Sequence, residues 1–119
     1  MAFVEGFVTA IPVAARATFL DHAKGAVRVF RQFGAGRIVD AWGADVPKGK
    51  VTDFYGSVKA RDDETVIFSW VEWPDKATRE AGQERLSAEM KAHMEDTPKP
   101  FDAVRVIVGS FEIINDAQG

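Results

Sequence analysis

Three acidic residues lie within apolar stretches of the sequence, where burial can make a carboxyl group suitable for proton transfer. Glu72 ends a row of aromatic residues on one face of a predicted strand, and Glu5 and Asp40 lie between apolar residues of two other predicted strands. Burial raises the pKa of a carboxyl group, so each could act as an acid or base near neutral pH. An ion pair with Arg37 or Arg105 is the stronger expectation, because structural pairs also occupy such positions. Glu72 is the catalytic candidate among the three.

The chain has two histidines, and histidine is the side chain whose ordinary pKa lies nearest neutral pH. His22 lies at the flank of the apolar face of a predicted helix, three residues after Phe19. His93 lies beside the apolar stripe of a second predicted helix. A histidine at a helix flank is more often a surface or hydrogen-bonded residue than a catalyst; of the two, His22 is the catalytic candidate ahead of His93. Neither stands in a zinc-binding pattern and cysteine is absent, so no metal site is predicted.

Aromatic residues recur in several predicted strands and could line a pocket for a planar small molecule. Such residues more often form a core or a dimer interface, which is the alternative interpretation. Gly34-x-Gly36 does not follow a strand, so it does not predict a dinucleotide site, and no organic cofactor is predicted. The predicted ligand-binding set is Trp42, Trp70, Phe68, Phe7 and Arg37.

These residues need a scaffold, and the hydrophobic periodicity predicts one. Apolar alternation predicts four strands and helical spacing predicts two helices, with Pro12 opening the first helix and Asp75 capping the second. Residues 51–63 fit either a strand or a short helix capped by Thr52 or Asp53, and a helical insertion in a long hairpin is preferred. The predicted strands cover residues 2–11, 37–43, 65–73 and 104–114, and the predicted helices cover residues 13–33 and 75–95.

The predicted order is therefore β-α-β-(insertion)-β-α-β within one domain, residues 1–119. Right-handed crossovers turn this order into an α+β, ferredoxin-like antiparallel sheet with both helices on one face. Three of the strands are apolar on both faces, and the helices can cover only one of them. We therefore expect a homodimer that buries the other face. The alternative is a monomer in which the insertion and both tails fold over the sheet.

Composition excludes several functional classes. The chain has 119 residues, with 15 Lys and Arg against 18 Asp and Glu and a formal net charge of −3. An acidic chain without a basic stripe is not expected to bind nucleic acid. No apolar run approaches the length of a membrane helix, so no membrane association is expected. No signal-peptide pattern precedes the first strand, and we expect a cytoplasmic protein.

Three sequence strings are similar to those of a known family. They are FGAGRIV at 33–39, DVPKGKVTDF at 45–54 and FSWVEWP at 68–74. Together with shorter matches near both ends, they resemble the YbaA-like (DUF1428) family of uncharacterised bacterial proteins. The resemblance implies a ferredoxin-like fold of the dimeric α/β-barrel type, in which two sheets face each other. It implies no reaction and no catalytic residue.

Two functional hypotheses follow. The first is a homodimer that binds a small apolar or aromatic molecule through its aromatic residues. The alternative is a cofactor-independent small-molecule enzyme of the oxygenase or isomerase type, in which Glu72 or His22 moves a proton. The second hypothesis rests on analogy with the fold, and one fold supports many functions.

Overall fold

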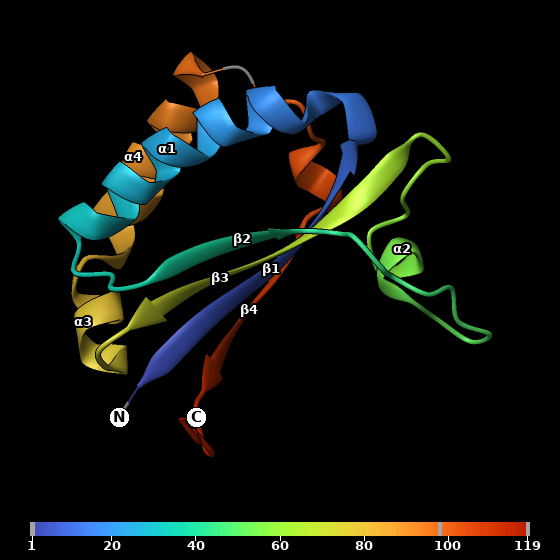
Figure 1. Ribbon diagram of the computed structural model, residues 1–119. Coiled ribbons are helices and arrows are strands. Elements are labelled where there is room, and N and C mark those ends of the chain that lie inside the picture. The colour runs from blue at the N-terminus through green and yellow to red at the C-terminus, as the bar shows by residue number, and fades with distance from the viewer. Residues whose placement is uncertain (1, 98, 119) are drawn as a thin grey trace.

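The computed structural model describes residues 2–97 and 99–118, and it is built around one antiparallel sheet with the strand order β2-β3-β1-β4. Helices α1 and α4 lie side by side over one face of this sheet, whereas the small helix α2 lies away from them (Figure 1). No helix within the described ranges is long and apolar enough to cross a membrane. The elements are β1 (Phe3–Pro12), α1 (Arg16–Gln32), β2 (Ile38–Trp42), α2 (Phe54–Ser57), β3 (Glu64–Trp73), α3 (Lys76–Ala81), α4 (Gln83–Asp96) and β4 (Ile107–Glu112).

This arrangement confirms the predicted ferredoxin-like fold, and the faces of the strands agree with the alternation in the sequence. The central strands β1 and β3 pair from Phe3 opposite Trp73 to Pro12 opposite Glu64. Ile11 and Trp73 are buried under the helices. Phe68, on the opposite face of β3, is partly exposed. The two-residue period of a strand is local, so it could be predicted without the tertiary structure.

Helix α1 begins later than predicted, because Pro12 ends β1 instead of opening the helix. A 3-10 turn follows, and the amide of Val13 donates to the carbonyl of Asp63 at 2.9 Å, which extends the pairing with the neighbouring segment. Helix α1 ends at Gln32, one residue before the predicted end at 33, and Gly34 follows with a φ of +96°, a conformation that favours glycine. The Gly34 amide donates to the carbonyl of Arg31 at 3.2 Å.

The second predicted helix is in fact two helices, α3 and α4, separated at Gly82. Asp75 caps α3 as predicted, since its carboxylate accepts from the amide of Thr78 at 2.7 Å. Gly82 lies with its backbone against the ring of Phe33, and a Cβ atom there would stand 2.8 Å from Phe33 Cδ1, so this junction requires glycine. A contact between residues so far apart in the sequence is not visible in helical periodicity.

The last strand is also shorter than predicted, since β4 begins at Ile107 and not at residue 104. Residues 103–105 form a 3-10 turn instead. The carboxylate of Asp102 accepts from the amide of Val104 at 3.0 Å and so holds the turn, which leaves the Val104 side chain exposed. The apolar alternation of this segment therefore begins before its backbone joins the sheet.

The hairpin insertion contains the preferred short helix. Asp53 caps α2, because its carboxylate accepts from the amide of Gly56 at 2.6 Å. The same carboxylate also accepts from the amide of Gly49, in the preceding loop, at 3.1 Å. Val58, which follows this helix, is fully buried against Ala10 and Val66. The insertion thus covers one end of the sheet face that α1 and α4 leave open.

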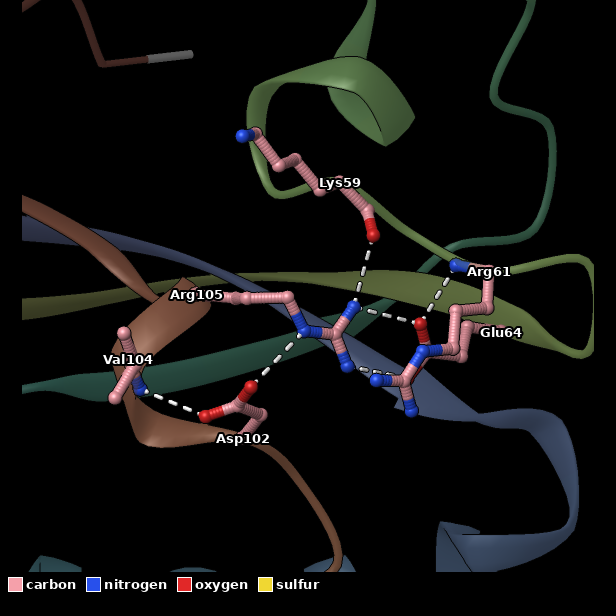
Figure 2. Close-up of polar contacts among 6 residues, drawn as sticks. All are labelled: Lys59, Arg61, Glu64, Asp102, Val104 and Arg105. Atoms are coloured by element: carbon pink, nitrogen blue, oxygen red, sulfur yellow. Dashed lines mark hydrogen bonds and ion pairs between the residues drawn. The ribbon is translucent and has the colours of Figure 1, made fainter.

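An ion pair connects the start of β3 to the turn before β4 (Figure 2). Arg105 donates from Nη1 and Nη2 to the two carboxylate oxygens of Glu64, at 2.8 and 2.9 Å. The amide of Arg61 also donates to Glu64, at 2.7 Å, and Arg105 donates further to the carbonyl of Lys59 at 2.9 Å. These contacts hold the pKa of Glu64 down, from 4.5 to about 2, chiefly through the hydrogen bond with Arg105.

This ion pair should make stability depend on acidic pH. Because the pKa of Glu64 is lower in the folded than in the unfolded chain, its contribution is complete above pH 4.5 and is lost as the pH falls towards about 2. We expect Glu64→Gln to lower the melting temperature at neutral pH and to reduce the difference between the melting temperatures at neutral and acidic pH. Thermal unfolding across this range measures both effects. Wild-type and variant curves that stay parallel throughout would contradict the prediction.

Candidate functional site

A cavity of about 250 Å³ lies between the sheet and the two helices α1 and α4. Its walls are mostly apolar, with contributions from β1, both helices and the segment before β4. The aromatic and aliphatic part of the lining includes Phe7, Val27, Phe30, Met90, Met94 and Phe101. An apolar enclosure of this kind is the usual setting of a small-molecule site.

His22 projects from α1 into the lining of this cavity and is only 5% exposed. The sequence predicted a position at the flank of the helix, but the packing of α4 and the 99–106 segment closes over that flank. The His22 ring stacks on the ring of His93 with centroids 4.7 Å apart, and it meets Phe101 edge-on at 5.3 Å. Its Nδ1 atom is buried without a hydrogen-bond partner among the described residues.

The environment of His22 favours the neutral form of its ring. Burial lowers the pKa of the imidazole below its ordinary value, and the neighbouring His93 and Lys99 act in the same direction. The Asp40 carboxylate opposes them. An uncharged imidazole has one N–H donor and one nitrogen lone pair, so His22 can exchange a proton with a molecule in the cavity.

His93 has a different role, because both of its ring nitrogens have partners. Nε2 lies 2.9 Å from the carbonyl oxygen of His22, and Nδ1 lies 3.2 Å from the hydroxyl of Thr97. A carbonyl oxygen only accepts, so Nε2 donates to it, and in the neutral ring Nδ1 then accepts from the Thr97 hydroxyl. Gly25 makes this approach possible, since a Cβ atom there would overlap the His93 ring. His93 therefore fixes the crossing of α1 and α4 and provides the surface on which His22 stacks.

The polar lining on the sheet side comes from Thr9 of β1 and from the pair Asp40 and Ser69. The two residues are direct partners in the β2–β3 register, and the Ser69 hydroxyl donates to Asp40 Oδ1 at 2.6 Å. Both line the cavity together with His22. Ser69 was not among the predicted site residues, although the strand alternation contains a signal: Ser69 interrupts the apolar row that Ile67 and Val71 present to the helices.

The predicted ligand-binding residues do not share one cavity. Phe7 lines the cavity under the helices, and Arg37 and Phe68 line a groove on the opposite face of the sheet. Trp70 borders both spaces. Trp42 lines neither of them, because it packs into the core beside Ile11, Phe19 and Ile67.

Glu72 lies in the groove on the opposite face, away from His22. Its carboxylate accepts from Nε1 of Trp70 at 2.9 Å, so the aromatic row does end in a carboxylate as the sequence indicates. The two catalytic candidates, Glu72 and His22, therefore line different spaces.

The prediction that the three candidate carboxylates pair with Arg37 or Arg105 is wrong within the described residues. Glu5 instead pairs with Arg79, with Nε 3.1 Å from Oε1, and accepts from Trp73 Nε1 at 2.9 Å. Arg105 is occupied by Glu64. The correct partner comes from α3, which folds back beside the sheet 74 residues further along the chain, so sequence position gave no indication of it.

The sheet face opposite the helices, hereafter the open face, carries exposed aromatic residues. Phe54, Phe68 and Trp70 form an edge-to-face row with ring centroids 6.1 and 5.8 Å apart. Phe111 extends the apolar surface on β4, where its ring lies over the facing glycines Gly6 and Gly109. A Cβ atom at Gly109 would stand 2.9 Å from this ring, so glycine is what lets Phe111 lie flat on the sheet.

Solved structures support the fold. The chain is similar to a dimeric ferredoxin-like protein from an uncultured marine organism, with a TM-score of 0.57 and 12% identity, covering 98% of this chain and 100% of that one. It is also similar to a Streptomyces coelicolor monooxygenase from the gene ActVA-Orf6 in complex with nanaomycin D, with a TM-score of 0.58, 15% identity and coverage of 99% and 92%. A third similar structure is SnoaB, a cofactor-independent oxygenase from Streptomyces nogalater, with a TM-score of 0.51, 13% identity and coverage of 97% and 95%.

The sequence comparisons are closer. The chain is 42% identical over 116 residues to the uncharacterised protein YbaA of Escherichia coli K12, covering 98% of this chain and 99% of YbaA. The family model described as protein of unknown function (DUF1428) matches residues 2–103. Both agree with the resemblance carried by the strings at 33–39, 45–54 and 68–74. The chain therefore belongs to the DUF1428 family.

Proposed function

We propose that this protein is a homodimer that binds a small apolar or aromatic molecule in the cavity between α1, α4 and the sheet. The observation that carries the proposal is a largely apolar cavity of about 250 Å³ that holds a buried His22 without a partner for Nδ1. Well-packed proteins rarely keep an apolar space of this size, so a ligand is the occupant that we propose for it. The cytoplasmic location stays a prediction from the sequence.

The size of the cavity suits one or two fused rings. An engineered apolar cavity of about 150 Å³ is large enough to bind benzene. The cavity here is larger, and its aromatic walls would contact a planar molecule from several sides.

The dimer is supported by the open face. Phe68, Ile107 and Phe111 are 43%, 44% and 58% exposed, and all three lie on this face. Contiguous apolar surface of this kind is uncommon on a monomer and marks an interaction site. The insertion covers only the end of the face near Val58. A second copy would present the same aromatic surface, and a two-fold dimer buries both at once.

Filling the cavity should remove binding without unfolding the protein. Ala26 lines the cavity, and we expect Ala26→Phe to weaken the binding of 2-methoxynaphthalene, a neutral two-ring probe, by about tenfold or more, because the new ring takes the space that the ligand needs. Fluorescence titration measures the affinity, and circular dichroism shows that the variant is folded. Ala17→Phe, on the exposed side of the same helix, is the matched control and should bind like the wild type. A folded Ala26→Phe variant that binds the probe normally would contradict this location.

The second candidate is an enzyme that acts on the bound molecule without an organic cofactor. It is favoured by the neutral, unpaired imidazole of His22, a group suited to general-base catalysis in an apolar site. The similarity to two oxygenases is consistent with it at the level of the fold. Oxygen uptake with activated aromatic compounds tests this candidate. Turnover that disappears in His22→Phe while binding persists would support it, and absence of turnover across such a panel would favour binding alone.

A further inference from the structure

We infer that the cavity selects a neutral aromatic compound that carries a hydroxyl group, and that this hydroxyl donates a hydrogen bond to His22. The inference rests on the proposed binding function and names the chemical class of its ligand. Its first support is that the cavity combines an apolar lining with a few polar groups. Phe7, Phe30 and Met90 belong to the apolar lining, and the polar members are Thr9, His22, Asp40 and Ser69.

Charge decides against an ionised ligand. The Asp40 carboxylate lines the cavity although the residue is exposed to solvent, so an anionic ligand would meet a negative charge there. The apolar walls would also impose the cost of removing water from any ion. A neutral ring compound avoids both penalties.

The hydrogen-bonding groups decide which polar substituent fits. The neutral His22 ring offers a nitrogen lone pair, and Asp40 offers only acceptor oxygens, one of which already accepts from Ser69. The His22 ring also has one N–H group, and Thr9 and Ser69 contribute hydroxyls, so a ligand hydroxyl, which both donates and accepts, complements the whole set. His22 lines the cavity, so its ring is the place where such a group would bind. An aromatic hydroxyl combines a donor of suitable acidity with the flat apolar body that the walls require.

Three matched probes test this inference. They are 2-naphthol, which can donate; 2-methoxynaphthalene, which cannot; and 2-naphthoate, which is anionic. We expect wild-type protein to bind 2-naphthol about tenfold more tightly than the methoxy compound, the effect of one hydrogen bond to a buried group, and to bind the naphthoate most weakly. The His22→Phe variant should bind 2-naphthol and 2-methoxynaphthalene equally, because the lone pair is gone and the apolar walls remain.

Fluorescence gives a second measurement on the wild-type protein alone. Excited 2-naphthol is a strong acid, so its O–H bond breaks when a base accepts the proton. The proton would move to His22 nitrogen and leave a naphtholate, whose emission lies at longer wavelength. We expect this emission from the bound probe in wild-type protein and not in His22→Phe. This readout does not depend on affinity, and its absence in wild-type protein overturns the contact even if the variant fails to fold.

The outcomes separate the inference from the proposed function. Equal affinities of the wild type for 2-naphthol and 2-methoxynaphthalene would overturn the ligand class and leave the binding site intact. A preference for 2-naphthol that persists in His22→Phe would overturn the assignment of the contact to His22. Failure of both neutral probes to bind would overturn the proposed function itself, and the inference with it.

Discussion

Replacing Phe68 with aspartate is expected to convert the protein from a dimer into a monomer of 13.1 kDa. Phe68 lies in the middle of the open-face aromatic row, in contact with Phe54 and Trp70. In the proposed dimer each copy would contribute one such aspartate, so two carboxylates without partners would be buried in the interface. A buried unpaired charge costs several kcal/mol, so the dissociation constant should rise by at least about a hundredfold.

Native mass spectrometry and light scattering at matched concentrations measure this change. Leu20→Asp is the control, since Leu20 is 51% exposed on α1 and lies outside the open face. This variant should remain a dimer, which separates an effect at the interface from a general effect of added charge. A wild-type protein that is already a monomer would contradict the dimer, and a Phe68→Asp variant that stays dimeric would contradict its location.

Replacing Trp73 with alanine should cause the largest loss of stability of the substitutions considered. Trp73 is 2% exposed and packs with Leu86 and Phe30 between β3 and the helices. Removing a buried aromatic ring leaves a cavity that costs about 3–5 kcal/mol in a protein core. The indole also donates to Glu5 at 2.9 Å, so the variant removes a hydrogen bond from a buried carboxylate.

Urea unfolding of the two variants Trp73→Ala and Trp73→Phe separates these contributions. The phenylalanine variant keeps most of the buried volume and loses only the N–H group, so we expect it to lose about 1–2 kcal/mol. A loss below about 1 kcal/mol for Trp73→Ala would contradict the position of Trp73 in the core. Equal losses for both variants would show that the hydrogen bond to Glu5, and not the packing, dominates.

The sequence predicted the order of the elements, the faces of the strands and the insertion, because each depends on contacts between near neighbours. Alternation places Phe68 and Ile67 on opposite faces of β3 whatever lies on either side of the sheet. Asp53 and Asp75 cap helices through amides three residues away. The excess of apolar residues on the open face followed from the same alternation, since two helices can cover only one side of the sheet.

The tertiary structure decided which residues form the candidate site. His22 appeared to lie at a helix flank, and it is buried because Gly25 lets His93 approach and because Phe101 packs against its ring. Ser69 becomes a partner of Asp40 only through the pairing of β3 with β2. Hydrophobic periodicity reports the face on which a residue lies, whereas a cavity depends on how closely two helices and a sheet approach one another. That distance is set by side chains far apart in the chain, so the sequence determined the scaffold and the packing determined the site.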